Sequence, residues 1–153
     1  MKPVRTAARA LILQNGYLLA IKMRDSRGIF YILPGGGQRP GETLEQTVRR
    51  ECQEELGVEV KPGSFAYVRE YIGKNHGFRH IHSQFHQVEV VFYAEIVRGT
   101  DLGQGHEKDK KQVGWSWIPV TELRSQSFYP ECIIAGLQSP EGLNGERYLG
   151  DVN

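Results

Sequence analysis

The segment GGGQRPGETLEQTVRRECQEELGV, residues 35–58, joins a glycine-rich loop to a helix whose two ends are both encoded locally. Thr43, followed three residues later by Gln46, matches a capping box, in which each side chain accepts a hydrogen bond from the other residue's backbone N–H. Gly57 suits the left-handed backbone position that ends a helix. The segment therefore predicts a helix over about residues 44–56 that starts directly after the loop.

Three glutamates of this helix, Glu51, Glu54 and Glu55, follow the spacing i, i+3 and i+4, so their carboxylates are neighbours. They overlap the edge of an apolar stripe that should face a sheet and consists of Leu44, Val48, Cys52 and Leu56. Like charges this close destabilise the helix unless they take up protons or bind a cation. Three oxygen donors suit Mg²⁺ or Mn²⁺. Arg50 precedes Glu54 by four residues and can hold that acid in place.

A solvated acidic face on a surface helix is the alternative explanation for this run of charges. The preceding residues LPGGG favour a binding site, because glycines let the backbone approach a ligand closely and tolerate a bound anion. Glycines between a strand and a helix also serve turn formation alone. From this segment by itself, both explanations stay open.

Apolar runs on either side of Asn15-Gly16 predict a β-hairpin, because this dipeptide tolerates the positive φ angles of a type I′ turn. Further strands are expected at FYIL, FAYVREYI, HQVEVVFYAEIV and VGWSWIPV. YPECIIAGLQ predicts a second helix with Pro130 in its first turn. These elements predict an α/β fold with a mixed β-sheet between helices. We expect one domain over residues 1–153, with the tail beyond about residue 140 partly frayed.

The composition is that of a soluble globular protein, with 153 residues, a net charge of +1 and 39% hydrophobic residues. This balanced charge argues against a protein that coats nucleic acid or a membrane. Cys52 and Cys132 are far apart and lack metal-binding spacing, so we interpret both as reduced thiols in the core. Polar residues interrupt the N-terminal apolar stretch before spanning length, so neither a signal peptide nor an anchor is expected. The expected location is the cytoplasm.

The segment resembles the Nudix box. Gly36 is followed after five residues by Glu42, and after seven more by Arg50-Glu51, then Glu54-Glu55, Gly57 and an aliphatic residue. Cys52 is the one departure, because it occupies a slot that is normally bulky and aliphatic, and we expect it to alter packing rather than chemistry. The box covers about a sixth of the chain, and the flanking YILPGG and WSWIPVTEL are also similar to the family. The resemblance implies the Nudix α/β/α sandwich.

Nudix hydrolases cleave pyrophosphate linkages with the help of divalent metals, so the resemblance implies Mg²⁺ or Mn²⁺ as cofactor. It places Glu51, Glu54 and Glu55 as metal ligands, with the Gly35 carbonyl as a further donor. Arg50 would orient the acids rather than contact the substrate, and Glu42 would support the helix entrance. We expect Glu54 to act as the general base. Glu107 is the candidate outside the box for an extra ligand or base, and a solvated loop acid is its alternative interpretation.

Candidate substrate-binding residues are Gly36, Arg24, Arg39, Arg79 and Glu107. Exposed arginines usually only solvate their surface, and so this role stays open for them. His80, His82 and His86 share strand parity. The three interpretations are a polar strand face or mobile loop, a substrate-lining role for Arg79, His80 or His82, and a separate zinc site. Tyr67, Tyr71, Phe78 and Phe92 should be mostly core, although any of them can stack on a base.

The resemblance implies a small nucleotide as substrate, because the family acts on a nucleoside diphosphate joined to another group. ADP-ribose-like nucleotide sugars, nucleoside triphosphates and dinucleoside polyphosphates all stay open. An RNA 5′ pyrophosphohydrolase is a second possibility, for which a larger basic surface is expected. A nucleotide-sensing domain without turnover is a third, and the intact acids speak against it. The resemblance is also compatible with a homodimer.

Overall fold

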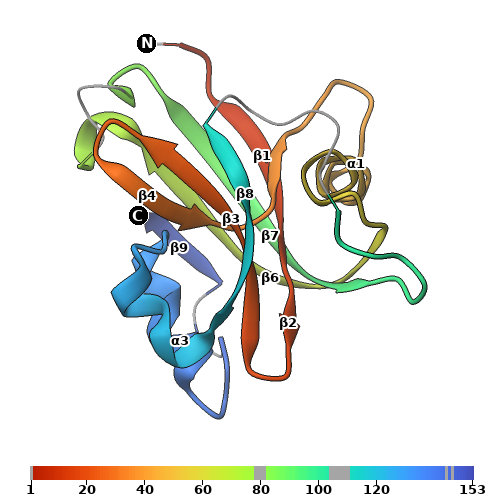
Figure 1. Ribbon diagram of the computed structural model, residues 1–153. Helices are drawn as coiled ribbons and strands as arrows, with labels where there is room; N and C mark the ends of the chain where they lie inside the picture. The colour runs from red at the N-terminus through yellow and green to blue at the C-terminus, as the bar shows by residue number, and fades with distance from the viewer. Residues whose placement is uncertain (1, 78–81, 104–110, 144, 146) are drawn as a thin grey trace.

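The computed structural model of the protein describes residues 2–77, 82–103, 111–143, 145 and 147–153 (Figure 1). Its strands are β1 (Arg5–Leu11), β2 (Leu13–Gln14), β3 (Tyr17–Asp25), β4 (Gly28–Ile32), β5 (Gly35–Gly37), β6 (Val60–Ile72), β7 (His86–Ile96), β8 (Gln112–Pro119) and β9 (Tyr148–Asp151). Its helices are α1 (Leu44–Leu56) and α3 (Ile134–Gln138), with 3₁₀ turns η1 (Gly73–Asn75), η2 (Val120–Gln126) and η3 (Glu131–Ile133).

The strands of the described residues form two sheets, which lie between α1 and the C-terminal helical turns (Figure 1). The first sheet has the order β5-β1-β7-β6-β9, and the second contains β2, β3 and β4 with β8 paired to β3. In the first sheet β1 runs parallel to β7, whereas β6 is antiparallel to β7. The predicted α/β fold with a mixed sheet is confirmed, with a second sheet added.

The local signals of α1 are confirmed. The Thr43 side chain accepts a hydrogen bond from the Gln46 N–H, and the Gln46 side chain accepts one from the Thr43 N–H. Gly57 has a φ of 68° and ends the helix. Of the two thiols expected in the core, Cys52 is buried and Cys132 is exposed. Val48, Cys52 and Leu56 are fully buried in a core cluster that also contains residues of β1, β3, β6 and β7. The helix is therefore fixed to the first sheet, on which it packs through β1, β5 and β6.

The Asn15-Gly16 turn is confirmed by positive φ angles of 51° and 81°. The apolar run before the turn, however, divides between the two sheets. Its residues 5–11 pair with β5 and β7, whereas residues 13–14 pair with β3. Both hydrogen-bonding edges of β1 are occupied, one by β5 and the other by β7, so β3 cannot pair with it.

Two predictions near the C-terminus are corrected. The second helix is a 3₁₀ turn followed by only five α-helical residues, and the Tyr129–Pro130 bond before it is cis. The tail is not frayed at residues 148–151, because β9 pairs in parallel with the edge of β6. Backbone hydrogen bonds from Val68 N to the Arg147 carbonyl and from Val152 N to the Glu70 carbonyl hold this segment. None of the helices described is long and apolar enough to cross a membrane.

Replacing Thr43 with Ala should lower the free energy of unfolding by about 1 kcal/mol, because the Gln46 N–H loses its acceptor at the helix start. Urea denaturation of the wild type and the variant measures the difference. Thr43→Ser keeps a hydroxyl in place and serves as the control. Equal losses in both variants would contradict a role for the hydroxyl.

Candidate active site

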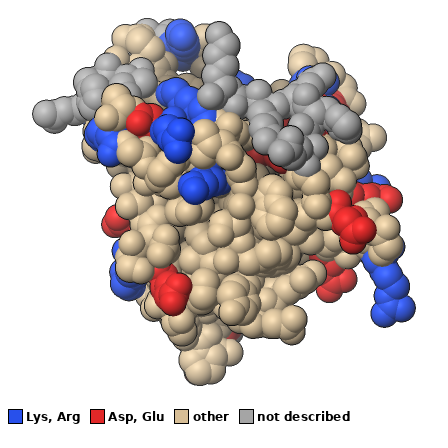
Figure 2. Space-filling model, viewed as in Figure 1, with Lys and Arg blue, Asp and Glu red and all other residues tan. Residues whose placement is uncertain are grey.

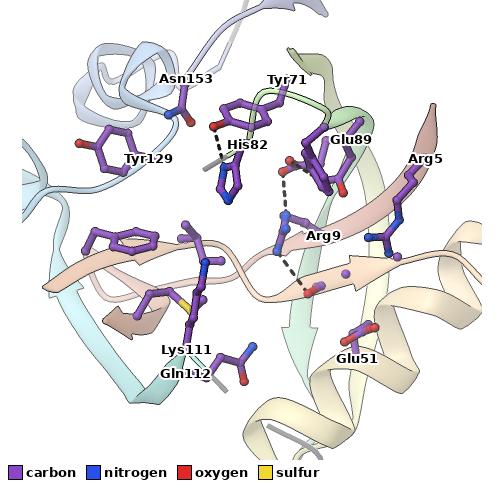
Figure 3. A pocket seen from close by; sticks show the side chains of 18 of the residues that line it. Arg5, Arg9, Glu51, Tyr71, His82, Glu89, Lys111, Gln112, Tyr129 and Asn153 are labelled. Carbon is purple, nitrogen blue, oxygen red and sulfur yellow. Dashed lines mark hydrogen bonds and ion pairs between the residues drawn. The ribbon is translucent and has the colours of Figure 1, made fainter. Parts of the chain in front are cut away.

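A cavity of about 580 Å³ brings the glycine loop and the acidic helix together with distant strands. Gly35, Gly36 and Gly37 line it together with the three helix glutamates. Other lining residues come from β1, β3, β4, β6, β7 and the segment at Lys111-Gln112. Figure 3 shows Glu51 on α1 facing this space, with Tyr71, His82, Tyr129 and Asn153 across it. The cavity therefore has an acidic end and an aromatic end.

Arg50 links the loop to the acids. Its Nη2 donates to the Gly37 carbonyl oxygen at 2.9 Å, and its Nε donates to Glu42 Oε2 at 2.7 Å. Its Nη1 donates to Glu51 Oε1 at 2.9 Å and lies 3.4 Å from both Glu54 oxygens. The hydrogen bond from Arg50 lowers the pKa of Glu42 to about 2. Arg50 therefore contacts the loop and all three of these acids, and its orienting role stays a prediction.

Glu55 is the most deeply placed of the three acids, with 4% of its surface exposed. Its Oε1 accepts from the Gly35 N–H at 3.0 Å, and its Oε2 accepts from Gln112 Nε2 at 2.8 Å. Burial raises the pKa of Glu55 to about 8, and the nearby Glu51 carboxylate adds to this rise. Glu51 lies against the loop, because a Cβ on Gly36 would be 2.6 Å from Glu51 Oε1. A larger residue at position 36 would displace that carboxylate from its present place.

The donor chemistry at the acidic end fits a hard divalent cation, since three carboxylates line one space. The ligand set is not preassembled. No three His, Cys, Asp or Glu side chains among the described residues are arranged to hold a metal ion. Arg50 already donates hydrogen bonds to the Glu51 and Glu54 carboxylates, and the Gly35 carbonyl oxygen accepts one from Arg9 Nη1 at 3.2 Å. Metal binding would therefore require side-chain rotation around a backbone that is already positioned.

A buried ion-pair chain across the first sheet was not predicted from the sequence. Arg9 Nε lies 2.8 Å from Glu89 Oε1, and Arg69 Nη2 lies 3.0 Å from Glu89 Oε2. Burial opposes ionisation of Glu89, but the two guanidinium groups outweigh it and keep its pKa below the usual value. Arg9 interrupts the otherwise apolar run AARAL. A charge in the middle of a buried strand is the signal that indicates such a pair.

The predicted substrate-binding residues divide into three groups. Gly36 lines the cavity, as does His82, whose Nδ1 lies 3.0 Å from the Tyr71 hydroxyl. Arg24 is exposed and does not line the cavity, and neither does Arg39, whose Nη2 lies 3.9 Å from Glu54 Oε1. Arg79, His80 and Glu107 lie outside the described residues.

The basic side chains that do line the cavity include Arg5 and Lys111, which sequence reasoning did not select. Arg5 lies so close to Gly37 that a Cβ there would be 2.4 Å from Arg5 Nη2.

Of the histidines considered in the sequence, His86 contacts Glu70, with its Nε2 3.0 Å from Glu70 Oε1. Among the described histidines, only His82 therefore lines this space.

Replacing Glu42 with Gln should destabilise the protein at pH 7, because Arg50 loses its ion-pair partner. A carboxylate with a lowered folded-state pKa stabilises the protein above its unfolded-state value and loses this effect as it is protonated. The difference in unfolding free energy between the two proteins should therefore shrink as the pH falls from 4.5 towards 2. Denaturation curves at several pH values measure this, with the exposed Glu45→Gln as the control. A difference that stays constant down to pH 3 would contradict the assignment.

Comparisons with known proteins find relatives that share part of this sequence. The nucleoside triphosphatase NudI of Salmonella agona (strain SL483) is 48% identical over 59 residues, which are 37% of this chain and 42% of that protein. The same enzyme from Enterobacter sp. (strain 638) is 45% identical over 69 residues, which are 40% and 49% of the two chains. The chain spans less than half the length of either curated relative. 

Among solved structures, a MutT NUDIX hydrolase from Burkholderia pseudomallei has a similar fold, with a TM-score of 0.69 and 23% identity. The likeness covers 90% of this chain and 100% of that one. The NUDIX domain family model matches residues 3–133, which include the whole loop, α1 and most of the lining strands. This match and the Arg50-centred acid cluster lead to one conclusion: the protein belongs to the Nudix family.

Proposed function

We propose that the protein is a divalent-cation-dependent hydrolase that cleaves the pyrophosphate linkage of nucleoside phosphates. One observation carries this proposal: a single cavity contains the three α1 glutamates and the glycine loop at one end and aromatic side chains at the other. A diphosphate beside a cation and a base beside aromatic rings would occupy these two ends. The local identity to nucleoside triphosphatases favours nucleoside triphosphates among the substrate classes.

We assign Glu51, Glu54 and Glu55 as the ligands of Mg²⁺ or Mn²⁺, with the Gly35 carbonyl as a further donor. When bound, the cation supplies charge neutralisation of the diphosphate and a lowered pKa for water. Glu54 is the proposed base, because Glu55 is buried and hydrogen-bonded on both oxygens. Arg50 keeps the acids in place from the side of the loop, through its bond to the Gly37 carbonyl.

Arg5 and Lys111 are the proposed phosphate contacts, in place of Arg24 and Arg39. Both line the cavity, and Arg5 lies against Gly37 of the loop. On the face shown in Figure 2, basic side chains gather near the upper edge and do not cover the surface. A small charged group matches a small nucleotide better than a long RNA, whose binding needs many phosphate contacts. A single domain, a cytoplasmic location and a homodimer remain predictions.

Hydrolysis should be detected in a Mg²⁺ and Mn²⁺ screen in ¹⁸O-labelled water. The panel contains nucleoside triphosphates, ADP-ribose, nucleotide sugars, dinucleoside polyphosphates and 5′-triphosphate RNA. Mass spectrometry then identifies the substrate and the phosphorus that water attacks. Turnover of the RNA alone would replace the small-nucleotide assignment, and tight nucleotide binding without any turnover would indicate a sensor.

Replacing Glu54 with Gln should lower kcat by roughly 10²–10⁴-fold, because the amide cannot accept the proton of the attacking water. The fold should persist, since the Glu54 contacts with Arg50 are long. Steady-state kinetics and thermal unfolding test both statements. Glu45→Gln makes the same chemical change on an exposed position of α1 and should leave kcat unchanged. Full activity in the Glu54 variant would remove the residue from the mechanism.

A further inference from the structure

The aromatic end of the cavity is bounded by rings from two separate parts of the chain. On one side Tyr71, His82 and Phe85 form a cluster, with centroids of Tyr71 and Phe85 6.1 Å apart. On the other side Phe30 and Tyr129 pack edge to face, with centroids 6.2 Å apart. All five residues line the same cavity. Rings on two sides of a polar space offer surfaces against which a nucleobase can pack, and Tyr71 is itself held in place by a stack on His76 with centroids 5.2 Å apart.

Two carboxamides at this end of the cavity are oriented by a single ion pair, Arg69–Glu89. Arg69 Nη1 donates to Asn153 Oδ1 at 3.2 Å, and Gln87 Nε2 donates to Glu89 Oε2 at 3.2 Å. A guanidinium can only donate and a carboxylate can only accept. The ion pair therefore fixes the orientation of both amides. Asn153 directs its oxygen to Arg69, whereas Gln87 directs its NH₂ group to Glu89.

The half of each amide that the ion pair does not bind is a donor in Asn153 and an acceptor in Gln87. Asn153 keeps its NH₂, which has no hydrogen-bond partner within the described part of the chain. Gln87 is 7% exposed and keeps its carbonyl oxygen. Both residues line the cavity, and Figure 3 shows Asn153 between Tyr129 and Tyr71 in that view. One donor and one acceptor, each fixed in kind, can read a base edge that offers the complementary pair.

Asn153 is placed by the C-terminal strand. The Asp151 carboxylate accepts from the Ile72 N–H at 2.8 Å and from Asn75 Nδ2 at 2.7 Å, and it lies 2.6 Å from His76 Nε2. Arg69 Nη1 also donates to the Val152 carbonyl at 2.6 Å. These bonds hold residues 151–153 at the cavity wall. The segment lies beyond residue 133, where the match to the family model ends.

We propose that Asn153 and Gln87, oriented by the Arg69–Glu89 ion pair, read the hydrogen-bonding edge of the nucleobase; this inference rests on the proposed function. Adenine and cytosine present an amino group beside a ring nitrogen acceptor, whereas guanine and uracil present a carbonyl beside a ring N–H. A fixed donor and acceptor favour one class over the other for a stacked base held in one orientation. The specificity-determining residues thus include one from outside the matched region.

The test is the ratio of kcat/KM values for the amino-type and oxo-type nucleoside triphosphates, measured for the wild type, Asn153→Asp and Asn153→Ala. Asn153→Asp keeps the oxygen that Arg69 binds and replaces the donor by an acceptor. We expect a wild-type preference for one class, and a decrease of that preference by about tenfold or more in both variants. Asn15→Asp makes the same charge change in the exposed hairpin turn and should leave the ratio unaltered.

The outcomes separate this inference from the proposed function. Turnover without a wild-type preference between the classes, or an equal change for all four bases in Asn153→Asp, would overturn the inference while the hydrolase assignment survives. If no nucleotide is hydrolysed, calorimetric titration with AMP, CMP, GMP and UMP still tests it. Binding that is selective between the classes and loses selectivity in Asn153→Asp supports base reading without catalysis. Binding with no such selectivity, or no binding, contradicts it.

Discussion

The ion pairs that Glu89 makes with Arg9 and Arg69 connect the two ends of the cavity. Glu89 is 1% exposed, so its charge is tolerated only because two guanidinium groups face it. Arg9 extends this chain to the carbonyl oxygens of Leu33 and Gly35, which begin the glycine loop. Arg69 extends it to Val152 and Asn153. Removing Glu89 would leave both guanidinium groups without their carboxylate and would disturb the loop and the C-terminal wall together.

Arg50 connects the glycine loop to the acidic side chains at the surface of α1. Its planar guanidinium reaches the Gly37 carbonyl, Glu42 and Glu51 at the same time, which a lysine ammonium cannot do with the same geometry. The loop and the helix are therefore held at a fixed separation before any ligand arrives. Positioning of this kind would lower the cost of bringing a substrate and the proposed metal ligands together.

Much of α1 was predictable because its signals are local. The capping box, the terminal glycine and the apolar stripe act within a few residues of each other, so tertiary contacts only add to them. The Asn15-Gly16 turn was predictable for the same reason. The division of the first apolar run between two sheets was not, because the strands that pair with β1 are β5 and β7, which are distant in sequence. Strand β9 was missed because its partner β6 is about 80 residues away in sequence.

The sequence by itself determined the acidic end of the site, since the loop, Arg50 and the glutamates lie within one segment of 24 residues that specifies its own helix. The tertiary structure alone decided the other end. Arg9, Arg69, Glu89 and Asn153 belong to four separate segments, and only sheet pairing brings them together. The physical reason is that helix ends and turns are encoded by neighbouring residues, whereas a buried charge is stable only where distant strands deliver its partners.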